Sequence, residues 1–371
     1  MPKSILSKNL SKPKVLSNCR QTSNQSDRGS IFIAARSMAS SDGIREFRAS
    51  SIHAGMRSLL SLSVLWQEKS RTSTSSDQLS DLSLSQFVIG IRCIKGAKED
   101  YENQDDFGIY LSAQGSLICV LDGHGPTGDR ISSFVQSRLM DETVSRLKTG
   151  SFRDVEKFFI DKFPEVDRDC IKRDHKIANK EEFDAYNSGT TATIIFLEET
   201  KLTVASVGDS RCILGVERSR SSGVYKCFEL TKDHSCERVD ERKRIKAAGG
   251  VVKRLEGDVP YRVFLPGKAY PGLAMTRAIG DASSEQAGII STPETSTFKI
   301  SQDGKRRFLV VASDGVWAFL TSQEVIKIVS RYPPENVQGA VDAVVHEALE
   351  KWKKISPFAI DDITCIVARI T

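Results

Sequence analysis

The sequence lacks long apolar runs, paired cysteines and, over most of its length, an excess of basic charge. No stretch of the 371 residues approaches the ~18 consecutive apolar residues that a membrane-spanning helix needs, so we expect no membrane span. The eight cysteines form no Cys-x-x-Cys pair, and this spacing argues against a zinc site. Several of them, such as Cys119 and Cys365, stand inside apolar runs, so we expect buried free thiols in a reducing compartment.

The formal net charge of +5 is unevenly distributed along the chain. Residues 1–80 carry 12 basic and 5 acidic side chains, a net charge of +7, whereas residues 81–371 carry 41 basic and 43 acidic ones, a net charge of −2. A body with this balance offers no basic surface for nucleic acid. We therefore expect no nucleic-acid partner.

Residues 1–80 have the composition of a disordered, basic, serine-rich tail. They include 20 serines and show no sustained hydrophobic periodicity. The locally apolar stretch 56–66 predicts a short helix that docks on the body. Because the tail carries no decisive targeting signal, we expect a cytoplasmic or nuclear protein and leave organelle targeting by the tail open.

From residue 85 onward, short apolar runs separated by Gly, Asp and Asn indicate a single folded domain at 85–371. Strands and helices do not repeat as βαβ units, which favours an α+β fold. Thr321 and Glu324 have the spacing of a capping box and predict a helix start. The insert 150–187 and the flap-like segment 253–271 are candidate specificity elements. Strands are predicted at 87–91, 108–111, 117–121, 190–197, 202–207, 308–312 and 363–370, and helices at 131–147 and 337–352.

Carboxylates follow or precede several of the predicted strands. Asp122, Asp209 and Asp314 each come at the end of an apolar run, and the pair Asp361-Asp362 directly precedes the strand at 363. Carboxylates gathered in this way repel one another unless a cation neutralises them. Oxygen ligands of this kind suit Mg²⁺ or Mn²⁺, so the pattern predicts a metal site.

Nine motifs occur in order along the body. They are Glu102-Asn103-Gln104-Asp105, Val120-Leu121-Asp122-Gly123-His124-Gly125, Ser188-Gly189-Thr190-Thr191-Ala192, Val207-Gly208-Asp209-Ser210-Arg211, Leu230-Thr231-Lys232-Asp233-His234, Ala247-Ala248-Gly249-Gly250, Leu273-Ala274-Met275-Thr276-Arg277-Ala278-Ile279-Gly280-Asp281, Ala312-Ser313-Asp314-Gly315-Val316-Trp317 and Asp361-Asp362-Ile363-Thr364. In this order they resemble the metal-dependent serine/threonine protein phosphatases, also called type 2C. The resemblance covers almost all of 85–371.

The resemblance implies two packed antiparallel β-sheets flanked by helices on both outer faces, with two Mg²⁺ or Mn²⁺ ions in the cleft between the sheets. By position, Asp122 resembles the carboxylate that bridges the two metals, and Gly123 would contribute its carbonyl oxygen. The other expected ligands are Asp314 and Asp361 for one metal, Asp105 through water, and Asp209 for a weaker third metal.

The resemblance also implies an activity. A water bridging two cations would have a lowered pKa, and the resulting hydroxide would attack the phosphorus of phosphoserine or phosphothreonine directly. His124 resembles the general acid that protonates the departing oxygen. The expected partners are phosphoprotein substrates, and we expect a monomer.

Three positions depart from the family pattern. Ala318 stands where an acidic residue is common, four residues after Asp314. The phosphate-binding arginine has no clear counterpart; Lys98 is our candidate and Arg92 the weaker alternative. Gln104 replaces a usual glutamate, and its amide could still hydrogen-bond a metal-bound water.

Two other functions compete with the phosphatase. A catalytically weak or inactive member would bind phosphoproteins without hydrolysis, and the departure at Ala318 motivates this reading. An unrelated metal-dependent hydrolase, such as a nuclease, fits poorly, because the acidic body would repel nucleic acid. Hydrolysis in the presence of Mn²⁺ separates the first alternative from an active phosphatase.

Overall fold

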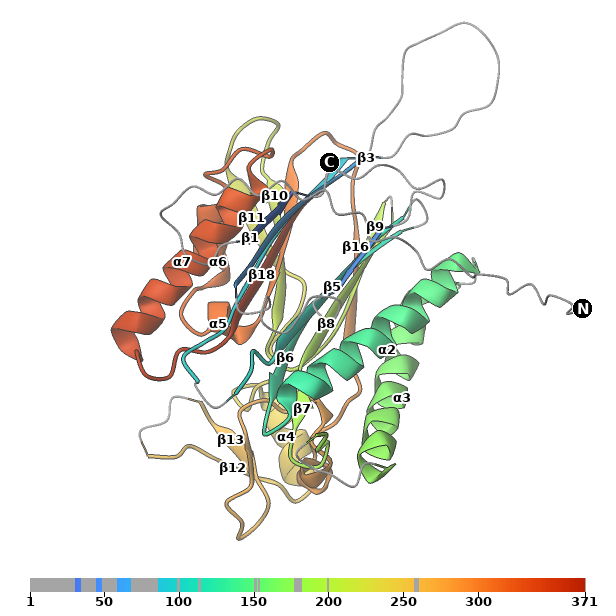
Figure 1. The fold of residues 1–371 in the computed structure, drawn as a ribbon, viewed down its shortest axis with the longest axis vertical. Coiled ribbons are helices and arrows are strands. Elements are labelled where there is room, and N and C mark those ends of the chain that lie inside the picture. The colour runs from blue at the N-terminus through green and yellow to red at the C-terminus, as the bar shows by residue number, and fades with distance from the viewer. Residues whose placement is uncertain are drawn as a thin grey trace, which may run out of the picture.

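Two large β-sheets lie face to face, and helices cover the outer face of each sheet (Figure 1). The computed structural model describes residues 31–34, 45–48, 59–67, 86–98, 101–112, 115–149, 152, 154–176, 182–198, 200–256 and 260–370. This arrangement confirms the predicted α+β class with two packed sheets and helices on both outer faces.

The first sheet has seven strands. All neighbours in it are antiparallel except β1 and β3, which run parallel. In spatial order the strands are β1 (Ile31–Ala34), β3 (Leu59–Gln67), β4 (Gln86–Ile94), β18 (Ile363–Ile370), β17 (Arg307–Ala312), β10 (Arg211–Glu217) and β11 (Tyr225–Glu229).

The second sheet has eight strands. Two of them, β8 and β9, correspond to the strands predicted at 190–197 and 202–207 and pair antiparallel. Its main path runs β15 (Ile279–Gly280), β7 (Gly189–Thr190), β6 (Ser116–His124), β8 (Ala192–Leu197), β9 (Lys201–Val207) and β16 (Glu294–Lys299). Strand β5 (Asp105–Leu111) also pairs with β6, and β2 (Arg45–Arg48) pairs with β5.

Alternation along the strands decides which side chains form each layer of the core. In β5, Phe107 and Ile109 pack into the layer between the two sheets, whereas Tyr110 faces the helices. In β6, Ile118 faces the layer between the sheets and Leu117 the helices. Because successive side chains of a strand point to opposite faces and both sets are apolar here, each sheet has two apolar faces. Both faces must be covered by other parts of the protein.

Helices supply that cover. The eight-stranded sheet packs against α2 (Gly128–Lys148) and α3 (Val155–Lys176), and α3 lies within the insert 150–187. The seven-stranded sheet packs against α5 (Asp314–Trp317), α6 (Ser322–Val329) and α7 (Val337–Ile355). The capping box of Thr321 and Glu324 is present at the start of α6, as predicted.

A small third sheet lies at one end of the two large ones (Figure 1). It consists of β12 (Val251–Lys253), β13 (Arg262–Phe264) and β14 (Pro271–Leu273), so it contains the flap-like segment expected from the sequence. The helix α4 (Val239–Ala247) and the 3-10 helix η2 (Ala282–Ala287) flank it along the chain. Its own apolar cluster includes Ile245, Val263 and Ile289.

The prediction for residues 56–66 was wrong, because residues 59–66 belong to strand β3 rather than to a helix. Leucines and serines alternate in Leu-Ser-Leu-Ser at 60–63, a period typical of strands, and β3 pairs with β4 along its whole length. Strands β1 and β2 also lie within the segment predicted as a disordered tail. The rest of residues 1–80 lies outside the described residues.

The described residues bear on two expectations from composition. No helix among them is long and apolar enough to cross a membrane. Their cysteines are free thiols, and all except Cys227 are buried.

Candidate active site

The predicted carboxylates meet where strands of the two large sheets end. Asp105 stands opposite Asp122 across the β5–β6 ladder. The buried Asp105 accepts a hydrogen bond through Oδ2 from Ser313 Oγ at 2.8 Å, and Ser313 directly precedes Asp314. This bond ties an aspartate of the eight-stranded sheet to the end of β17 in the seven-stranded sheet.

These carboxylates raise one another's pKa. Burial, followed by the charges of Asp314 and Asp105, raises the pKa of Asp122 well above its usual value. The pKa of Asp314 rises to about 8, first through burial and then through Asp361 and Asp209. The buried oxygens Asp105 Oδ1 and Asp209 Oδ1 have no hydrogen-bond partner in the described part of the chain. A divalent cation would relieve both the repulsion and the missing partners, so these residues fit a metal centre.

Gly123, next to Asp122, is closely surrounded by backbone atoms. A side-chain Cβ there would come within 2.3 Å of the Gly128 carbonyl oxygen, so only glycine fits. Its N–H donates to the Gln104 carbonyl at 3.1 Å. The Gln104 side chain donates from Nε2 to the Gly125 carbonyl at 2.8 Å, so in this structure it braces the loop after β6.

The two members of the acidic pair before β18 have different surroundings. The Asp361 carboxylate forms an ion pair with Lys98, at 2.6 Å between Oδ1 and Nζ. The Asp362 carboxylate accepts backbone N–H bonds from Gly96 at 2.7 Å and Gln104 at 2.8 Å. Asp362 therefore holds together the loop between β4 and β5, a role that the sequence alone did not suggest.

The two candidates for the phosphate-binding residue, Lys98 and Arg92, have different surroundings. Lys98 reaches the carboxylate cluster through Asp361. Partial burial lowers the pKa of Lys98, but the charge and hydrogen bond of Asp361, together with the charges of Asp122 and Asp362, outweigh this effect and raise that pKa. Arg92 instead forms an ion pair with Asp342 of α7, at 3.2 Å, on the outer face of the seven-stranded sheet. The side chain of Arg92 therefore lies on the face of the sheet that packs against α7, away from the layer between the two sheets.

His124, at the end of β6, hydrogen-bonds a residue that received no role from the sequence. Its Nε2 lies 2.6 Å from Asp281 Oδ2. Burial lowers the pKa of His124, but the neighbouring carboxylates, Asp281 first and then Asp209 and Asp314, together outweigh this effect and raise that pKa. A signal for Asp281 did exist, because Gly280-Asp281 follows the apolar pair Ala278-Ile279 in the same way as the other strand-terminal aspartates.

A family model described as protein phosphatase 2C matches residues 100–351. The chain belongs to this family. It is 33% identical to "Probable protein phosphatase 2C 61" of Arabidopsis thaliana over 69% of this chain and 76% of the relative. It is also 33% identical to "Probable protein phosphatase 2C 35" of Arabidopsis thaliana over 73% of this chain and 79% of the relative.

Solved structures of other proteins share the fold. The crystal structure of serine-threonine phosphatase 2C from Toxoplasma gondii aligns with a TM-score of 0.64 and 18% identity, over 83% of this chain and 99% of the other. A C. elegans sex determining protein aligns with a TM-score of 0.60 and 20% identity, over 76% of this chain and 64% of the other. At these identities the likeness concerns the fold alone.

Asp209, at the end of β9, lies beside a second carboxylate. Burial and then the charge of Asp233 raise the pKa of Asp209 to about 6. Asp233 itself receives two hydrogen bonds from the Arg211 guanidinium, at 2.9 and 2.6 Å. Because Arg211 neutralises Asp233, we assign the metal-ligand potential to Asp209 alone.

Ala318, at the position where the type 2C pattern often has an acidic residue, is exposed at the end of the short helix α5. Its N–H donates to the Asp314 carbonyl at 2.7 Å. A longer side chain at 318 would therefore start one helical turn beyond Asp314 and in contact with solvent.

A separate group of carboxylates, formed by Asp240, Glu241 and Glu294, also lies close enough to hold a cation. Its charges are already matched by arginines. The shortest N–O distances are 2.5 Å for Arg238 to Asp240, 2.7 Å for Arg238 to Glu294, 2.7 Å for Arg277 to Glu241 and 2.8 Å for Arg244 to Glu241. This group is an ion-pair network that connects α4 with the chain before β15 and with β16, rather than a metal site.

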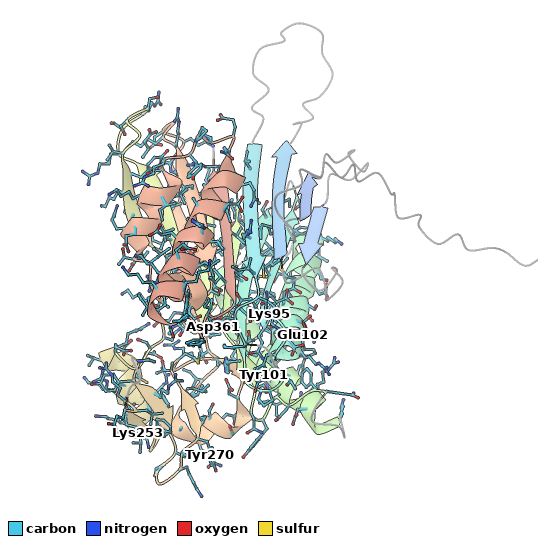
Figure 2. All side chains as sticks on the ribbon, turned by 60° about the vertical axis from the view of Figure 1, so that its left-hand side comes forward. Lys95, Tyr101, Glu102, Lys253, Tyr270 and Asp361 are labelled. Atoms are coloured by element: carbon cyan, nitrogen blue, oxygen red, sulfur yellow. The ribbon has the colours of Figure 1, made fainter. Side chains whose placement is uncertain are left out.

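Figure 2 shows which surface surrounds the carboxylate cluster. Lys95, Glu102 and Asp361 lie at the end of the large sheets that faces the small sheet. Lys253 and Tyr270 lie on the small sheet.

Proposed function

We propose that this chain is an active protein serine/threonine phosphatase that hydrolyses phosphoserine and phosphothreonine in phosphoproteins with the help of Mg²⁺ or Mn²⁺. The observation that carries the proposal is the cluster of carboxylates at the strand ends, where partial burial and then the charges of neighbouring carboxylates raise the pKa of both Asp122 and Asp314. Membership of the protein phosphatase 2C family supports the reaction class.

The cation ligands in this proposal are oxygens. Asp122, the carbonyl oxygen of Gly123, Asp314 and Asp361 would hold the cations. Asp105, fixed by Ser313, would support the site through water. Asp209 would hold a weaker third cation. No histidine or cysteine belongs to this set, which favours Mg²⁺ or Mn²⁺ over zinc.

When bound, the cations would supply Lewis-acid chemistry and a water of lowered pKa near neutral pH. The chain's own residues would do the rest. Lys98 would bind a phosphate oxygen as a point charge. His124 would give a proton to the serine or threonine oxygen as its bond to phosphorus breaks. Asp362 would keep the Lys98 loop in place through its bonds to Gly96 and Gln104.

The binding-only alternative is less well supported. It would predict lost metal ligands, yet every carboxylate proposed as a ligand is present. The two acidic positions that are replaced are Ala318, which is exposed, and Gln104, whose amide can still hydrogen-bond a metal-bound water. We therefore propose that Ala318 affects metal affinity rather than the ability to catalyse. We further propose a monomer acting in the cytoplasm or nucleus on phosphoprotein substrates.

The decisive experiment is hydrolysis of a phosphothreonine peptide by the full chain. We expect phosphate release in millimolar Mn²⁺ or Mg²⁺ and none in excess chelator. Activity that persists in chelator would contradict the metal requirement. No release with either metal would support the binding-only alternative.

A further inference from the structure

We propose that Asp281 is the positioning residue for His124, which fixes the orientation and tautomer of the imidazole for proton donation. This inference rests on the proposed phosphatase function. It adds a residue to the machinery of that function, because neither the strand-end pattern nor the metal cluster requires Asp281.

The contact between the two side chains is short and sheltered. His124 Nε2 and Asp281 Oδ2 are 2.6 Å apart, and Asp281 is 3% exposed. The other ring nitrogen, Nδ1, is buried and has no hydrogen-bond partner among the described residues. Since a carboxylate only accepts hydrogen bonds, Asp281 selects the form in which Nε2 carries a proton. Nδ1 is then the nitrogen left for the substrate.

The backbone holds Asp281 in a conformation that non-glycine residues rarely adopt. Its φ of +51° and ψ of +41° lie in the left-handed region. Its N–H donates to the Ser188 carbonyl at 2.9 Å, and its own carbonyl accepts bonds from the N–H and the hydroxyl of Ser284, at 2.7 and 2.6 Å. A strained residue that its surroundings hold so firmly is typical of a functional site.

The helical insert also fixes this turn. Asp167 of α3 accepts a hydrogen bond from the Gly280 N–H at 2.8 Å and another from Ser291 Oγ at 2.9 Å. Gly280 directly precedes Asp281, so α3 holds the turn that presents the carboxylate. Through this contact, the insert 150–187 helps to position Asp281.

Gly189 of β7 makes room for the pair. It stands opposite His124 in the β6–β7 ladder and opposite Gly280 in the β7–β15 ladder. A Cβ at 189 would lie 2.1 Å from Asp281 Oδ2 and 2.9 Å from His124 Nε2. The absent side chain at 189 is therefore a condition for the contact between His124 and Asp281.

The proton balance of the proposed step is simple. The imidazolium of His124 gives the Nδ1 proton to the leaving oxygen of serine or threonine while the bond from that oxygen to phosphorus breaks. The ring is left neutral with its Nε2 proton still directed at Asp281. Asp281 is not protonated in the step; it stabilises the charged ring before the step and orients the ring throughout.

The test uses two substrates whose leaving groups differ in their need for a proton. The serine or threonine alkoxide is strongly basic and needs the proton, whereas 4-nitrophenolate is weakly basic and leaves without it. We expect Asp281→Asn to lower kcat on a phosphothreonine peptide by about 10- to 100-fold. This loss is smaller than the full rate enhancement that general acid catalysis supplies, because His124 is still present. On 4-nitrophenyl phosphate we expect a change of less than about threefold. Asparagine tolerates the left-handed backbone, so the turn should persist.

Three further variants sharpen the result. His124→Gln should show the same dependence on the leaving group, and the double variant should be no worse than His124→Gln alone, because both changes remove one function. Gly189→Ala should reproduce the Asp281→Asn pattern by displacing the carboxylate.

Glu217→Gln is the matched control, since it changes a buried carboxylate at the far end of β10 that accepts backbone N–H bonds from Gly223 and Arg306. It should leave the ratio of the two activities unchanged.

Nitrogen NMR of the histidine rings tests the inference without catalysis. We expect the wild-type spectrum to show His124 protonated at Nε2, and Asp281→Asn to shift that signal. An equal loss of activity on both substrates, or additive effects in the double variant, would overturn the positioning role. A wild-type chain that hydrolyses neither substrate would instead overturn the proposed function, and the NMR result would then decide the His124–Asp281 assignment by itself.

Discussion

Lys98 and Asp361 form an ion pair of 2.6 Å although 263 positions separate them in the sequence. The lysine comes from the loop between β4 and β5, and the aspartate directly precedes β18. Both side chains are partly exposed, at 43% for Lys98 and 28% for Asp361. A pair this accessible contributes at most about 1 kcal/mol to stability, so its value lies in placing a cationic group beside the carboxylate cluster.

We predict that Lys98→Ala raises KM for a phosphothreonine peptide by about 10- to 100-fold, since a charge-assisted bond is worth roughly 1.5–3 kcal/mol. The melting temperature should hardly change. Steady-state kinetics and a thermal melt check both statements. Lys98→Arg should recover much of the affinity, and Arg92→Ala, which alters the ion pair with Asp342, should leave KM unchanged. A KM effect from Arg92→Ala would contradict our choice between the two residues.

The second prediction concerns Asp314, whose pKa is raised to about 8. Without metal, the folded state binds this proton more tightly than the unfolded chain does, so stability falls as pH rises from about 4 to 8. Asp314→Asn should therefore raise the melting temperature in chelator at neutral pH and flatten that pH dependence. The same variant should lose turnover by more than about 100-fold, because a ligand to the cation is removed. Wild-type turnover, or a lower melting temperature in chelator, would count against the assignment.

Restoring an acidic residue at position 318 should strengthen metal binding. Ala318 is exposed, one turn beyond Asp314, so a carboxylate there would stay solvated and cost little stability. We expect Ala318→Asp to lower the Mn²⁺ concentration needed for half-maximal activity, with little change at saturating metal and an unchanged melting temperature. Ala318→Asn is the neutral control. Identical metal titration curves for Ala318→Asp and wild type would show that this position does not face the cations.

The ion-pair network beside the small sheet should stabilise the fold. Glu241 is buried, and hydrogen bonds from Arg277, Thr276 and Arg244 outweigh the cost of burial and lower its pKa to about 2. Glu241→Gln should reduce the free energy of unfolding by about 3–5 kcal/mol at pH 7, because the arginines lose their buried partner. The contribution is complete above the unfolded pKa of about 4.5 and disappears as pH falls toward 2, so the difference from wild type should shrink in that range.

Urea unfolding at pH 7, 4.5 and 3 measures this difference. Asp240→Asn, in the same network but mostly exposed, should cost no more than about 1 kcal/mol. Equal effects of the two substitutions would argue that the buried position of Glu241 has no special role.

The last prediction concerns the N-terminal strands. A chain starting near Ser80 would keep every proposed catalytic and metal-binding residue, so we expect it to hydrolyse a phosphopeptide at low temperature. It would lose β3, the neighbour of β4 over nine residue pairs, so its melting temperature should fall by several degrees. A chain starting near Ser58 would keep β3 and should melt closer to the full chain. Equal melting temperatures for all three would show that β3 does not stabilise the domain.

Several features of this protein followed from the sequence by itself. Strand-terminal aspartates such as Asp122 and Asp314 were identifiable because a period of two marks strands, and the first polar residue after an apolar run marks where a strand ends. The limits of β18 and the start of α6 were predictable for the same reason, since periodicity and capping are local properties. The order of the motifs then pointed to the family.

Tertiary structure alone decided which distant residues meet. The contact between His124 and Asp281 joins positions 157 apart and depends on how β7 and β15 pair beside β6. The choice of Lys98 over Arg92 depended on which face of β4 turns outward, and the sequence alone did not show which face would meet α7. Such contacts depend on strand register and on the packing of one sheet against another. Both arise from interactions between distant parts of the chain, whereas periodicity can be recognised within each short segment.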